Sequence, residues 1–512
     1  MKGAKILQAL LGGMLCGLGM WLALSVPYHP RTFRIEAGGC RLVMDIAEPS
    51  GDSPKGYVVL LHGISASKKI MAYLAQGFRE EGLRVFVPDL PGHGRTSGVF
   101  SPMRAEECTE SLLHELVTRG LADPERTILA GHSMGGAIAL RVASRNPVAG
   151  VIAISPAPMG EAPGIPLELV PYPSLGSLPK HSLVMNGAWE PAQIREAAKN
   201  LVVSPGDGTS EYVRVPRATH VSILFDSAAL EKAELWAAQT LHFRAEPQLP
   251  SQRGWLGFLA GFAGILLLAG PFLRELLGSK STTDTAREDA ARQGSVRSAG
   301  EWLVLGLGSA GMLVYWTPLR RLRLFEGDYF ASFLLILGIA LAAMHWRALR
   351  VSLMADGVKE SGWKRSRPII AATFGALMLL LLFTAWLDLS LTESWMGAAR
   401  WARFAPFLAA VLPYHAAEEL ALGTHEGLRG WRRMALALLL RLAAFGAVLA
   451  GVFALHSGQV LLVILAPYFA LFCVLQRWGM NVVRQETRSL AATAVFGAIL
   501  LAGFCLVAFP AT

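Results

Sequence analysis

The sequence predicts two kinds of structure in one chain: a mostly parallel α/β domain with helices on both faces of its sheet, and an all-α polytopic transmembrane bundle. In residues 28–250, apolar strand-like runs alternate with helical patterns, which is typical of a parallel sheet covered on both faces. Residues 251–512 are mostly long apolar runs separated by short basic loops. Finally, Gly131-His132-Ser133-Met134-Gly135 lies between an apolar run and a helical pattern, the context that a nucleophilic serine elbow requires.

Composition supports a membrane protein. Of the 512 residues, 53% are hydrophobic and only 17% are charged, whereas soluble proteins have about 25% charged residues. The net charge of +9 is carried mainly by arginines beside apolar segments, as in membrane proteins, so we expect no nucleic-acid partner. Because no C-x-x-C and no other metal-ligand spacing is present, we expect no metal and no cofactor.

The chain divides into five predicted regions. They are an N-terminal anchor or signal at 1–27, the α/β domain at 28–250, a transmembrane helix at 251–276, a charged linker at 277–300 and a multi-span helical domain at 301–512. The first apolar run, Ile6–Val26, is long enough to span a bilayer, which takes about 20 residues. We therefore favour an uncleaved anchor over a signal peptide cleaved near Ala23-Leu24-Ser25.

With this anchor, about nine spans are expected by the length criterion. The others are Trp255–Phe272, Trp302–Trp316, Tyr329–Trp346, Ile369–Leu387, Phe404–Leu422, Met434–Leu455, Val460–Leu475 and Leu490–Phe509. Lys and Arg are concentrated in the loops on the same side as the N-terminus, and loops rich in these residues usually face the cytoplasm. We therefore expect a protein of the bacterial inner or plasma membrane, with residues 28–250 on the side away from the cytoplasm. Only Arg320-Arg321-Leu322-Arg323 and a few other arginines oppose this orientation.

The elements of the α/β domain follow from periodicity. The predicted strands are a leading hairpin of Phe33–Ile35 and Arg41–Ile46, then Tyr57–Leu61, Arg84–Val87, Thr127–Ala130, Val151–Ile154, Ser182–Met185 and Glu211–Val215. The predicted helices are Lys68–Gly82, Ala105–Arg119, Gly136–Arg145, Pro191–Asn200 and Val221–Leu241. Tyr57–Leu61 is continuously apolar, as expected of a strand covered on both faces.

Three motifs in this order resemble the α/β-hydrolase superfamily, in particular its monoacylglycerol-lipase and lysophospholipase-like branch. They are Val58-Val59-Leu60-Leu61-His62-Gly63, Asp89-Leu90-Pro91-Gly92-His93-Gly94 and Gly131-His132-Ser133-Met134-Gly135-Gly136. The resemblance covers about residues 32–242 and does not extend to the membrane part. It implies a serine hydrolase whose nucleophile, acid and base follow one another along the chain in that order.

On this resemblance, Ser133 is the nucleophile and His220, in the loop after Glu211–Val215, is the base. Glu190 is the acid, in a turn where the family carries aspartate, and Asp207 is the alternative acid. The acid would hold the His220 tautomer and stabilise its cation. The expected oxyanion donors are the backbone N–H groups of Ile64 and Met134.

The segment Ser155–His181, where the family often inserts a lid, is rich in proline and glycine and contains no long amphipathic helix. We therefore expect a shallow, open site, for which the bilayer could supply an apolar wall. Cys40 and Cys108 are the cysteines of the α/β domain. Two free thiols are the simpler interpretation, and a disulfide would require an oxidising compartment.

His415, Glu418 and Glu419 are ionisable residues within a predicted span, where charge is costly. Helical spacing turns His415 toward both glutamates, and Arg441 in the next span can reach the same depth. A structural ion pair is the favoured interpretation of this intramembrane polar cluster. The alternative is a site for protons, ions or lipid headgroups.

The function that the sequence predicts is a membrane-anchored serine hydrolase that cleaves carboxylic esters, including lipid or lysolipid esters, through an acyl-enzyme on Ser133. One alternative is a membrane transport or scaffold protein whose hydrolase-like domain only binds a ligand. Another is an acyltransferase or peptidase with the same triad. The expected partners are membrane lipids and a small-molecule or lipid ester substrate.

Overall fold

The computed structural model forms two compact units by its internal contacts. The described residues are 2–51, 53–160, 170–203, 209–278, 299–351, 363–423 and 430–512. The first of the two compact units, which we call the helical unit, comprises Met1–Trp21, Phe258–Trp386 and Met396–Phe509. We call the second the sheet unit; it comprises Leu22–Gly257, Leu387–Trp395 and Pro510–Thr512.

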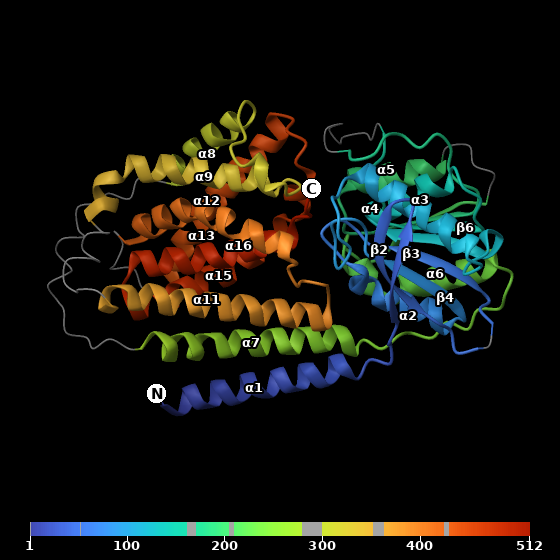
Figure 1. Cartoon of the computed structure of the whole chain (residues 1–512), viewed down its shortest axis with the longest axis horizontal. Coiled ribbons are helices and arrows are strands. Elements are labelled where there is room, and N and C mark those ends of the chain that lie inside the picture. Colours follow the sequence, from blue (N-terminus) through green and yellow to red (C-terminus); the bar gives the residue numbers. More distant parts are fainter. Residues whose placement is uncertain are drawn as a thin grey trace. The chain divides into compact units, whose positions relative to one another are not determined.

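The sheet unit is built on an eight-stranded sheet of order β1-β2-β4-β3-β5-β6-β7-β8 (Figure 1). The strands are β1 (Arg31–Ala37), β2 (Cys40–Ala47), β3 (Gly56–Leu61), β4 (Leu83–Pro88), β5 (Thr127–His132), β6 (Gly150–Ile154), β7 (Ser182–Gly187) and β8 (Glu211–Val215). β2 pairs antiparallel with β1 and β4, and all other neighbours are parallel. The predicted mostly parallel sheet is confirmed.

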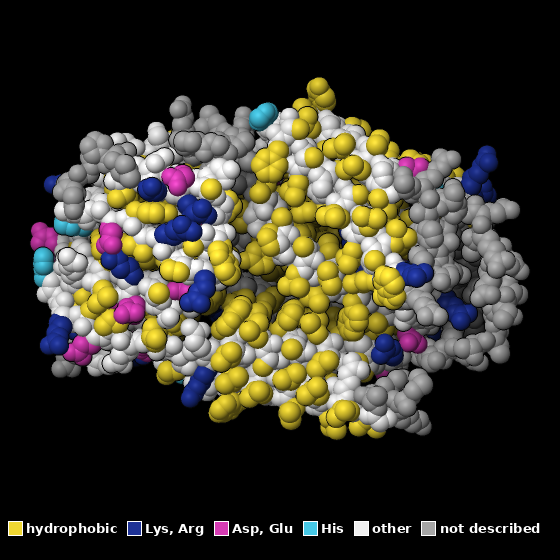
Figure 2. Space-filling view, turned by 180° about the vertical axis from the view of Figure 1, so that it is seen from behind, with side chains coloured by type: hydrophobic (Ala, Val, Ile, Leu, Met, Phe, Trp, Pro, Cys, Tyr) yellow, Lys and Arg dark blue, Asp and Glu magenta, His cyan; other side chains and the backbone are white. Residues whose placement is uncertain are grey.

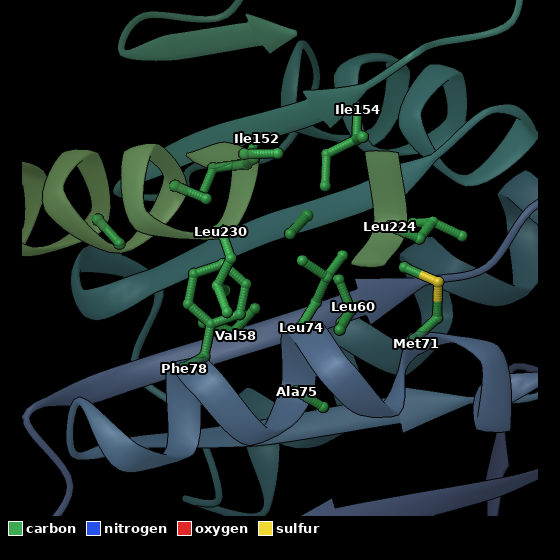
Figure 3. Close-up of a cluster of buried hydrophobic side chains, with 14 of the residues drawn as sticks. Val58, Leu60, Met71, Leu74, Ala75, Phe78, Ile152, Ile154, Leu224 and Leu230 are labelled. Carbon is green, nitrogen blue, oxygen red and sulfur yellow. The ribbon is translucent and has the colours of Figure 1, made fainter. Parts of the chain in front are cut away.

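Helices cover both faces of this sheet (Figure 1). They are α2 (Ala72–Glu80), α3 (Pro102–Thr118), α4 (Met134–Ala143), α5 (Ala192–Val203) and α6 (Ser227–Thr240). On the face covered by α2 and α6, Leu74, Phe78 and Leu230 pack against Val58 and Ile152 of the strands (Figure 3). All five side chains are fully buried. This core explains why the strands read as continuous apolar runs.

Two predicted helices are interrupted in the structure. The expected helix Lys68–Gly82 begins with a 3₁₀ turn, η1 (Lys68–Met71), before α2. The expected helix Val221–Leu241 consists of a 3₁₀ turn, η4 (Ser222–Phe225), followed by α6. Asp226 causes the second break, because its carboxylate accepts hydrogen bonds from the first turn of α6 and caps that helix.

The expectation of two free thiols in the sheet unit is wrong. Cys40, at the start of β2, and Cys108, on α3, form a disulfide with their Cα atoms 5.7 Å apart. The hairpin of β1 and β2 packs beside α3, so two cysteines 68 residues apart in the sequence meet. Cys16, Cys473 and Cys505 are free.

The helical unit is built from helices, most of which are long and apolar. They are α1 (Lys2–Leu24), α7 (Arg253–Leu277), α8 (Ala299–Leu313), α9 (Gly327–Met344), α11 (Trp363–Ser390), α12 (Ala398–Gly423), α13 (Gly430–Ala454), α14 (Val460–Ile464), α15 (Ala466–Thr487) and α16 (Leu490–Ala508). The expected spans are mostly helical, although Val460–Leu475 is divided at Leu465 between α14 and α15. Among the described residues only six helices are both long and apolar enough to cross a membrane. α8 has only 15 residues, and α12 carries the ionisable residues noted above.

Large apolar side chains cover much of the surface of the helical unit that Figure 2 shows. Leu10 and Met14 on α1, Val304 on α8 and Leu442 on α13 are each about two-thirds exposed. Such extensive apolar surface is unfavourable in water and is typical of a surface that contacts lipid or another protein.

Candidate active site

Ser133 occupies a sharp turn between β5 and α4. Its backbone is in a strained conformation, with φ 53° and ψ −117°, which is typical of a nucleophile that a strand-to-helix elbow presents at the edge of a sheet. The turn requires a small residue at 135, because a Cβ on Gly135 would overlap the backbone carbonyl groups of Leu61 and His62. The tight packing of the elbow against β3 therefore fixes the position of the serine.

His220 lies against this serine. Its Nε2 is 3.0 Å from Ser133 Oγ, within the distance at which an imidazole can accept the hydroxyl proton. The loop after β8 carries His220, and the backbone carbonyl of His220 is 2.7 Å from Nε2 of His132. The imidazole of His220 is still 25% exposed, so a substrate can reach it.

Glu190, in the turn after β7, holds the other side of the imidazole. Its Oε2 is 3.2 Å from His220 Nδ1, and its side chain is completely buried. Ser155 Oγ and the backbone N–H of Gly187 both donate to Oε1 over 2.6 Å, and Asn186 donates to Oε2 over 3.1 Å.

These contacts keep the Glu190 carboxylate ionised. Burial opposes ionisation, but the hydrogen bond and the positive charge of His220 outweigh it, with further help from Ser155 and Gly187, so the pKa of Glu190 is lowered. An ionised Glu190 can stabilise an imidazolium on His220. The alternative acid, Asp207, lies outside the described residues.

The other histidines near the elbow bind the loops around it. Leu90 N donates to His62 Nε2 over 3.0 Å, and Ser65 N donates to His93 Nε2 over 3.2 Å. Burial lowers the pKa of His62 to about 4 and that of His132 to about 3. Both therefore remain neutral at physiological pH, which suits a hydrogen-bonding role in the loops.

The loop after β3 passes directly beside the nucleophile. A Cβ added to Gly63 would lie 3.2 Å from Ser133 Cβ and 3.1 Å from His132 Nδ1. This close approach brings the loop that carries the Ile64 amide to the side of Ser133. The other expected oxyanion donor, Met134, is the first residue of α4, so its amide belongs to the positive end of a helix.

The sequence did not point to Ser155 or Asn186, although both bind the Glu190 carboxylate. Asn186 is within β7 and Ser155 follows β6 directly, with φ 46°. The signal that could have found them is position: each lies at the carboxyl end of a parallel strand, where polar side chains converge. Within the part of the chain that the structure describes, no group of His, Cys, Asp and Glu could hold a metal ion.

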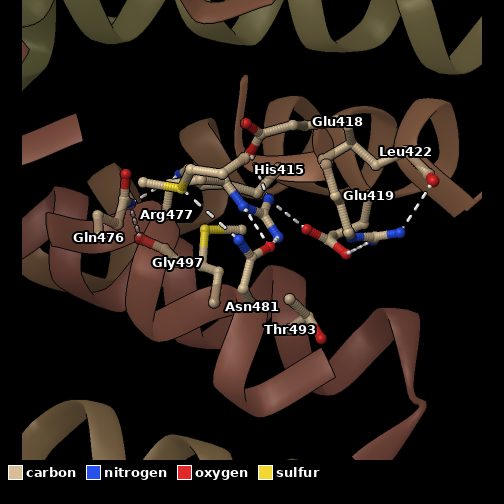
Figure 4. Close-up of polar contacts among 12 residues, drawn as sticks. His415, Glu418, Glu419, Leu422, Gln476, Arg477, Asn481, Thr493 and Gly497 are labelled. Atoms are coloured by element: carbon tan, nitrogen blue, oxygen red, sulfur yellow. Dashed lines mark hydrogen bonds and ion pairs between the residues drawn. The ribbon is translucent and has the colours of Figure 1, made fainter. Parts of the chain in front are cut away.

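The polar cluster expected from the sequence forms in the helical unit (Figure 4). Arg441 binds both carboxylate oxygens of Glu418, over 2.6 and 2.9 Å. His415 Nδ1 is 3.5 Å from the same carboxylate. Glu419 binds Arg477 and Arg433, and Arg477 also lies 3.5 Å from Glu418. Neither arginine was expected in the cluster from the sequence. The expectation that His415 faces both glutamates therefore holds for Glu418 only.

Comparisons with known proteins agree with this geometry. Residues 58–322, just over half of the chain, match the alpha/beta hydrolase family. The chain is 35% identical to the monoacylglycerol lipase of Mycolicibacterium smegmatis over 114 residues, which are 22% of this chain and 40% of that protein. It is 33% identical to the monoglyceride lipase of Rattus norvegicus over 138 residues, 26% of this chain and 45% of that protein. It thus spans less than half the length of these relatives.

Solved structures of similar fold include an α/β serine hydrolase without a lid from Xanthomonas campestris. That structure has a TM-score of 0.34 and 17% identity, and the match covers 43% of this chain and 98% of the other. A serine hydrolase homologue from Coxiella burnetii has a TM-score of 0.33 and 21% identity, with 41% and 96% covered. From the family match, with the elbow and the sheet that carries it, we conclude that this chain belongs to the α/β hydrolase family.

Proposed function

We propose that the protein is a membrane-anchored serine hydrolase that cleaves carboxylic esters through an acyl-enzyme on Ser133. The observation that carries the proposal is the hydrogen-bonded chain from Ser133 Oγ through the His220 imidazole to the buried Glu190 carboxylate. A nucleophile, a base and an acid that orients the base are the groups that acyl transfer requires.

In the proposed mechanism, Ser133 Oγ attacks the ester carbonyl carbon while its proton moves to His220 Nε2. The backbone amides of Ile64 and Met134 donate to the oxyanion of the tetrahedral intermediate. When the intermediate collapses, the C–O bond to the alcohol breaks and the alcohol takes the proton from His220. A water molecule then attacks the acyl-enzyme, giving its proton to His220, and the carboxylic acid leaves as Ser133 recovers its proton.

We propose lipid or lysolipid esters as the substrate class. The six long apolar helices would hold the enzyme in a bilayer, where such esters are concentrated, and the two relatives named above are lipases of monoacylglycerol. The described parts of the segment 155–181 contain no helix, which favours an open site. Membrane lipids are accordingly the proposed partners.

We further propose that the sheet unit lies outside the cytoplasm. The distribution of Lys and Arg among the loops favours this orientation. The disulfide between Cys40 and Cys108 supports it independently, because disulfides persist in oxidising compartments.

A fluorophosphonate probe tests the proposal, since it reacts with an activated serine. A membrane-impermeant probe should label the wild-type protein on intact cells or, in a bacterium with an outer membrane, on spheroplasts. Ser133→Ala should not be labelled, whereas Ser144→Ala, which changes a serine at the end of α4, should be labelled normally. A folded wild-type protein that does not react, even after solubilisation, would overturn the enzymatic function and favour a ligand-binding domain.

Product analysis then identifies the reaction. Purified protein should release fatty acid from monoacylglycerol in mixed micelles, and water should be the main acceptor when alcohols and amines compete. Transfer of the acyl group to the alcohol or amine would indicate an acyltransferase. Cleavage of peptides but not of esters would indicate a peptidase.

A further inference from the structure

The sheet unit includes a segment from far along the chain. Leu387–Trp395 comprises the last turn of α11 and most of the connection to α12, and it belongs to the sheet unit by its contacts. Glu393 N donates to Ser67 Oγ over 2.8 Å, and Thr392 Oγ1 lies 3.0 Å from the same hydroxyl. These contacts fall three residues beyond Ile64, on the loop that carries an expected oxyanion donor.

Charge reinforces this contact. The Glu393 carboxylate forms an ion pair with Lys68 Nζ and lies 3.2 Å from Arg95 Nε. Lys68 Nζ is also 3.0 Å from Asp89 Oδ2. Two cations therefore face two carboxylates.

The centre of this group is out of contact with solvent. The Lys68, Asp89 and Glu393 side chains are 1%, 0% and 4% exposed. A buried charge is costly unless it is paired. Asp388 of the same segment extends the group, because it lies 3.4 Å from Lys69 Nζ and 4.0 Å from the Arg95 guanidinium. Three cations then face three carboxylates, and Leu387–Trp395 contributes two of these carboxylates, Asp388 and Glu393.

Hydrogen bonds from backbone amides also join this charged group to the loop after β3, which carries the Ile64 amide. Asp89 accepts hydrogen bonds from Lys68 N over 2.8 Å and from Arg95 N over 2.9 Å. The loop after β3 and the loop after β4 are also joined by the hydrogen bonds of His62 and His93 described above. Together these hydrogen bonds hold the loops after β3 and β4 against each other, and Gly63 in the first of these loops packs against Ser133.

We propose that Leu387–Trp395 is a positioning segment of the catalytic centre. Glu393, acting through Lys68 and Asp89, holds the Ile64 amide where it stabilises the oxyanion. This inference rests on the proposed function. It makes the connection between α11 and α12 necessary for the full rate of the hydrolase, although Glu393 does not touch the reacting atoms and is a positioning residue.

The test uses the full-length protein in detergent and the variant Glu393→Gln, which removes the charge but retains the size. Losing an oxyanion donor costs about 10²–10³ in kcat, so we expect a displaced donor to lower kcat for p-nitrophenyl butyrate about tenfold. KM should change less than twofold, because the ground-state ester makes little use of this donor. Affinity for an alkyl boronic acid, which forms a tetrahedral adduct on the serine, should fall in parallel.

Further variants distinguish a segment that positions the Ile64 amide from one that is only attached to the sheet unit. Glu393→Asp keeps the charge and should recover part of the lost kcat. Glu211→Gln, which removes an exposed carboxylate paired with Lys232 at 2.8 Å, is the matched control and should keep the wild-type kcat. If Glu393→Gln does not fold, Thr392→Val removes the contact with Ser67 alone, and we expect kcat to fall about two- to threefold by a smaller displacement of the same donor.

Unchanged kcat and boronate affinity in folded Glu393→Gln would overturn the inference and leave the segment as an anchor. A change confined to KM would also overturn it, because the segment would then act on substrate binding. These results are distinct from failure of the proposed function, in which the wild-type protein itself would not react with the fluorophosphonate.

Discussion

Ser133 and His220 are 87 residues apart in the sequence, yet the hydroxyl of one and the imidazole of the other are 3.0 Å apart. His132, next to the serine, also binds the backbone carbonyl of His220 over 2.7 Å. The loop after β8 is thus fixed to the elbow at two consecutive residues, through a side chain and through the backbone. Such double attachment reduces the motion that would otherwise separate a base from its nucleophile.

Replacing Glu190 with glutamine should lower kcat for ester hydrolysis by about 10⁴, the size of effect seen when the acid of a serine triad becomes an amide. The amide cannot stabilise the imidazolium and favours the wrong tautomer of His220. Ser155→Ala, which removes one donor to Oε1 but keeps the charge, should lower kcat by about ten- to a hundredfold, since a hydrogen bond to a charged group contributes about 1.5–3 kcal/mol. Steady-state kinetics with p-nitrophenyl esters provide the measurement.

If Glu190→Gln kept the wild-type kcat, Glu190 would not be the acid of the triad. Asp207 would then be the candidate for that role. Glu190→Asp is the informative partner, because it restores the residue that the family carries here. If the longer side chain of glutamate is adapted to this turn, the aspartate variant should be intermediate between wild type and Glu190→Gln.

Removal of the disulfide should destabilise the sheet unit. The bond closes a loop of 68 residues, and by the chain-entropy relation such a loop contributes on the order of 4 kcal/mol to the free energy of unfolding. In Cys40→Ser/Cys108→Ser, loss of esterase activity on heating should therefore occur about 10 °C below the wild-type midpoint. The variant Cys505→Ser, which changes a free thiol, is a control for the cysteine content.

Alkylation of the unreduced protein checks the bond itself. Cys40 and Cys108 should react with iodoacetamide only after reduction. If both react without reductant in protein from freshly broken cells, the bond is absent in the cell and the argument for an oxidising compartment is lost.

The strands and the serine elbow could be predicted from the sequence, because each depends on the pattern of neighbouring residues. Tyr57–Leu61 is apolar throughout since both faces of the sheet are covered, and a glycine is required at 135 since the elbow packs on β3. The positions of Ser133 and His220 followed from motif order, and the structure brings these side chains together. Glu190 was recognisable from its place in the turn after β7.

The remaining features depend on contacts between residues far apart in sequence. Lys68 and Glu393 are 325 residues apart, and neither belongs to a motif, so no pattern joins them. The pairing of Cys40 with Cys108 requires knowing that the leading hairpin lies beside α3. Arg477 was missed because an arginine near the end of a span resembles an interfacial anchor, although its side chain is fully buried against Glu419.

Glu234 should make the stability of the sheet unit depend on pH. It is fully buried on α6, and neither of its oxygens has a hydrogen-bond partner among the described residues. Burial, with the nearby charges of Glu81 and Glu80, raises its pKa from the ordinary 4.5 to about 8. Between those two values the folded protein binds a proton that the unfolded chain does not.

The free energy of unfolding should therefore fall as the pH rises from about 4.5 to about 8, by at most about 1.4 kcal/mol per pH unit from this group. Glu234→Gln should remove that slope and be more stable than the wild type above pH 7. The midpoint of thermal inactivation between pH 5 and 9 provides the comparison. Glu231→Gln, at an exposed position of the same helix, should retain most of the slope; equal slopes in wild type and Glu234→Gln would contradict the assignment.

The Glu418–Arg441 pair should be required for folding of the helical unit. Its side chains are 0% and 5% exposed, and Arg441 also binds Cys473 O and Gln476 Oε1 over 2.9 and 2.8 Å. Glu418→Gln leaves Arg441 without a carboxylate and should cost about 3–5 kcal/mol, whereas Arg441→Gln leaves Glu418 with Arg477 at 3.5 Å and should cost less. Glu418→Gln and Arg441→Gln should each lower the unfolding midpoint, measured by resistance to proteolysis in detergent.

The double variant distinguishes a structural pair from a functional site. If the two groups serve mainly each other, Glu418→Gln/Arg441→Gln should lose less stability than the sum of the single losses, because no unpaired charge remains. Labelling of Ser133 by fluorophosphonate should keep its normal rate in every variant that folds, and exposed Arg432→Gln should match the wild type throughout. A well-folded Glu418→Gln that loses a bilayer-dependent activity would instead make the cluster a site for protons, ions or lipid headgroups, since the carboxylate would then be needed for its charge and not for its contribution to folding.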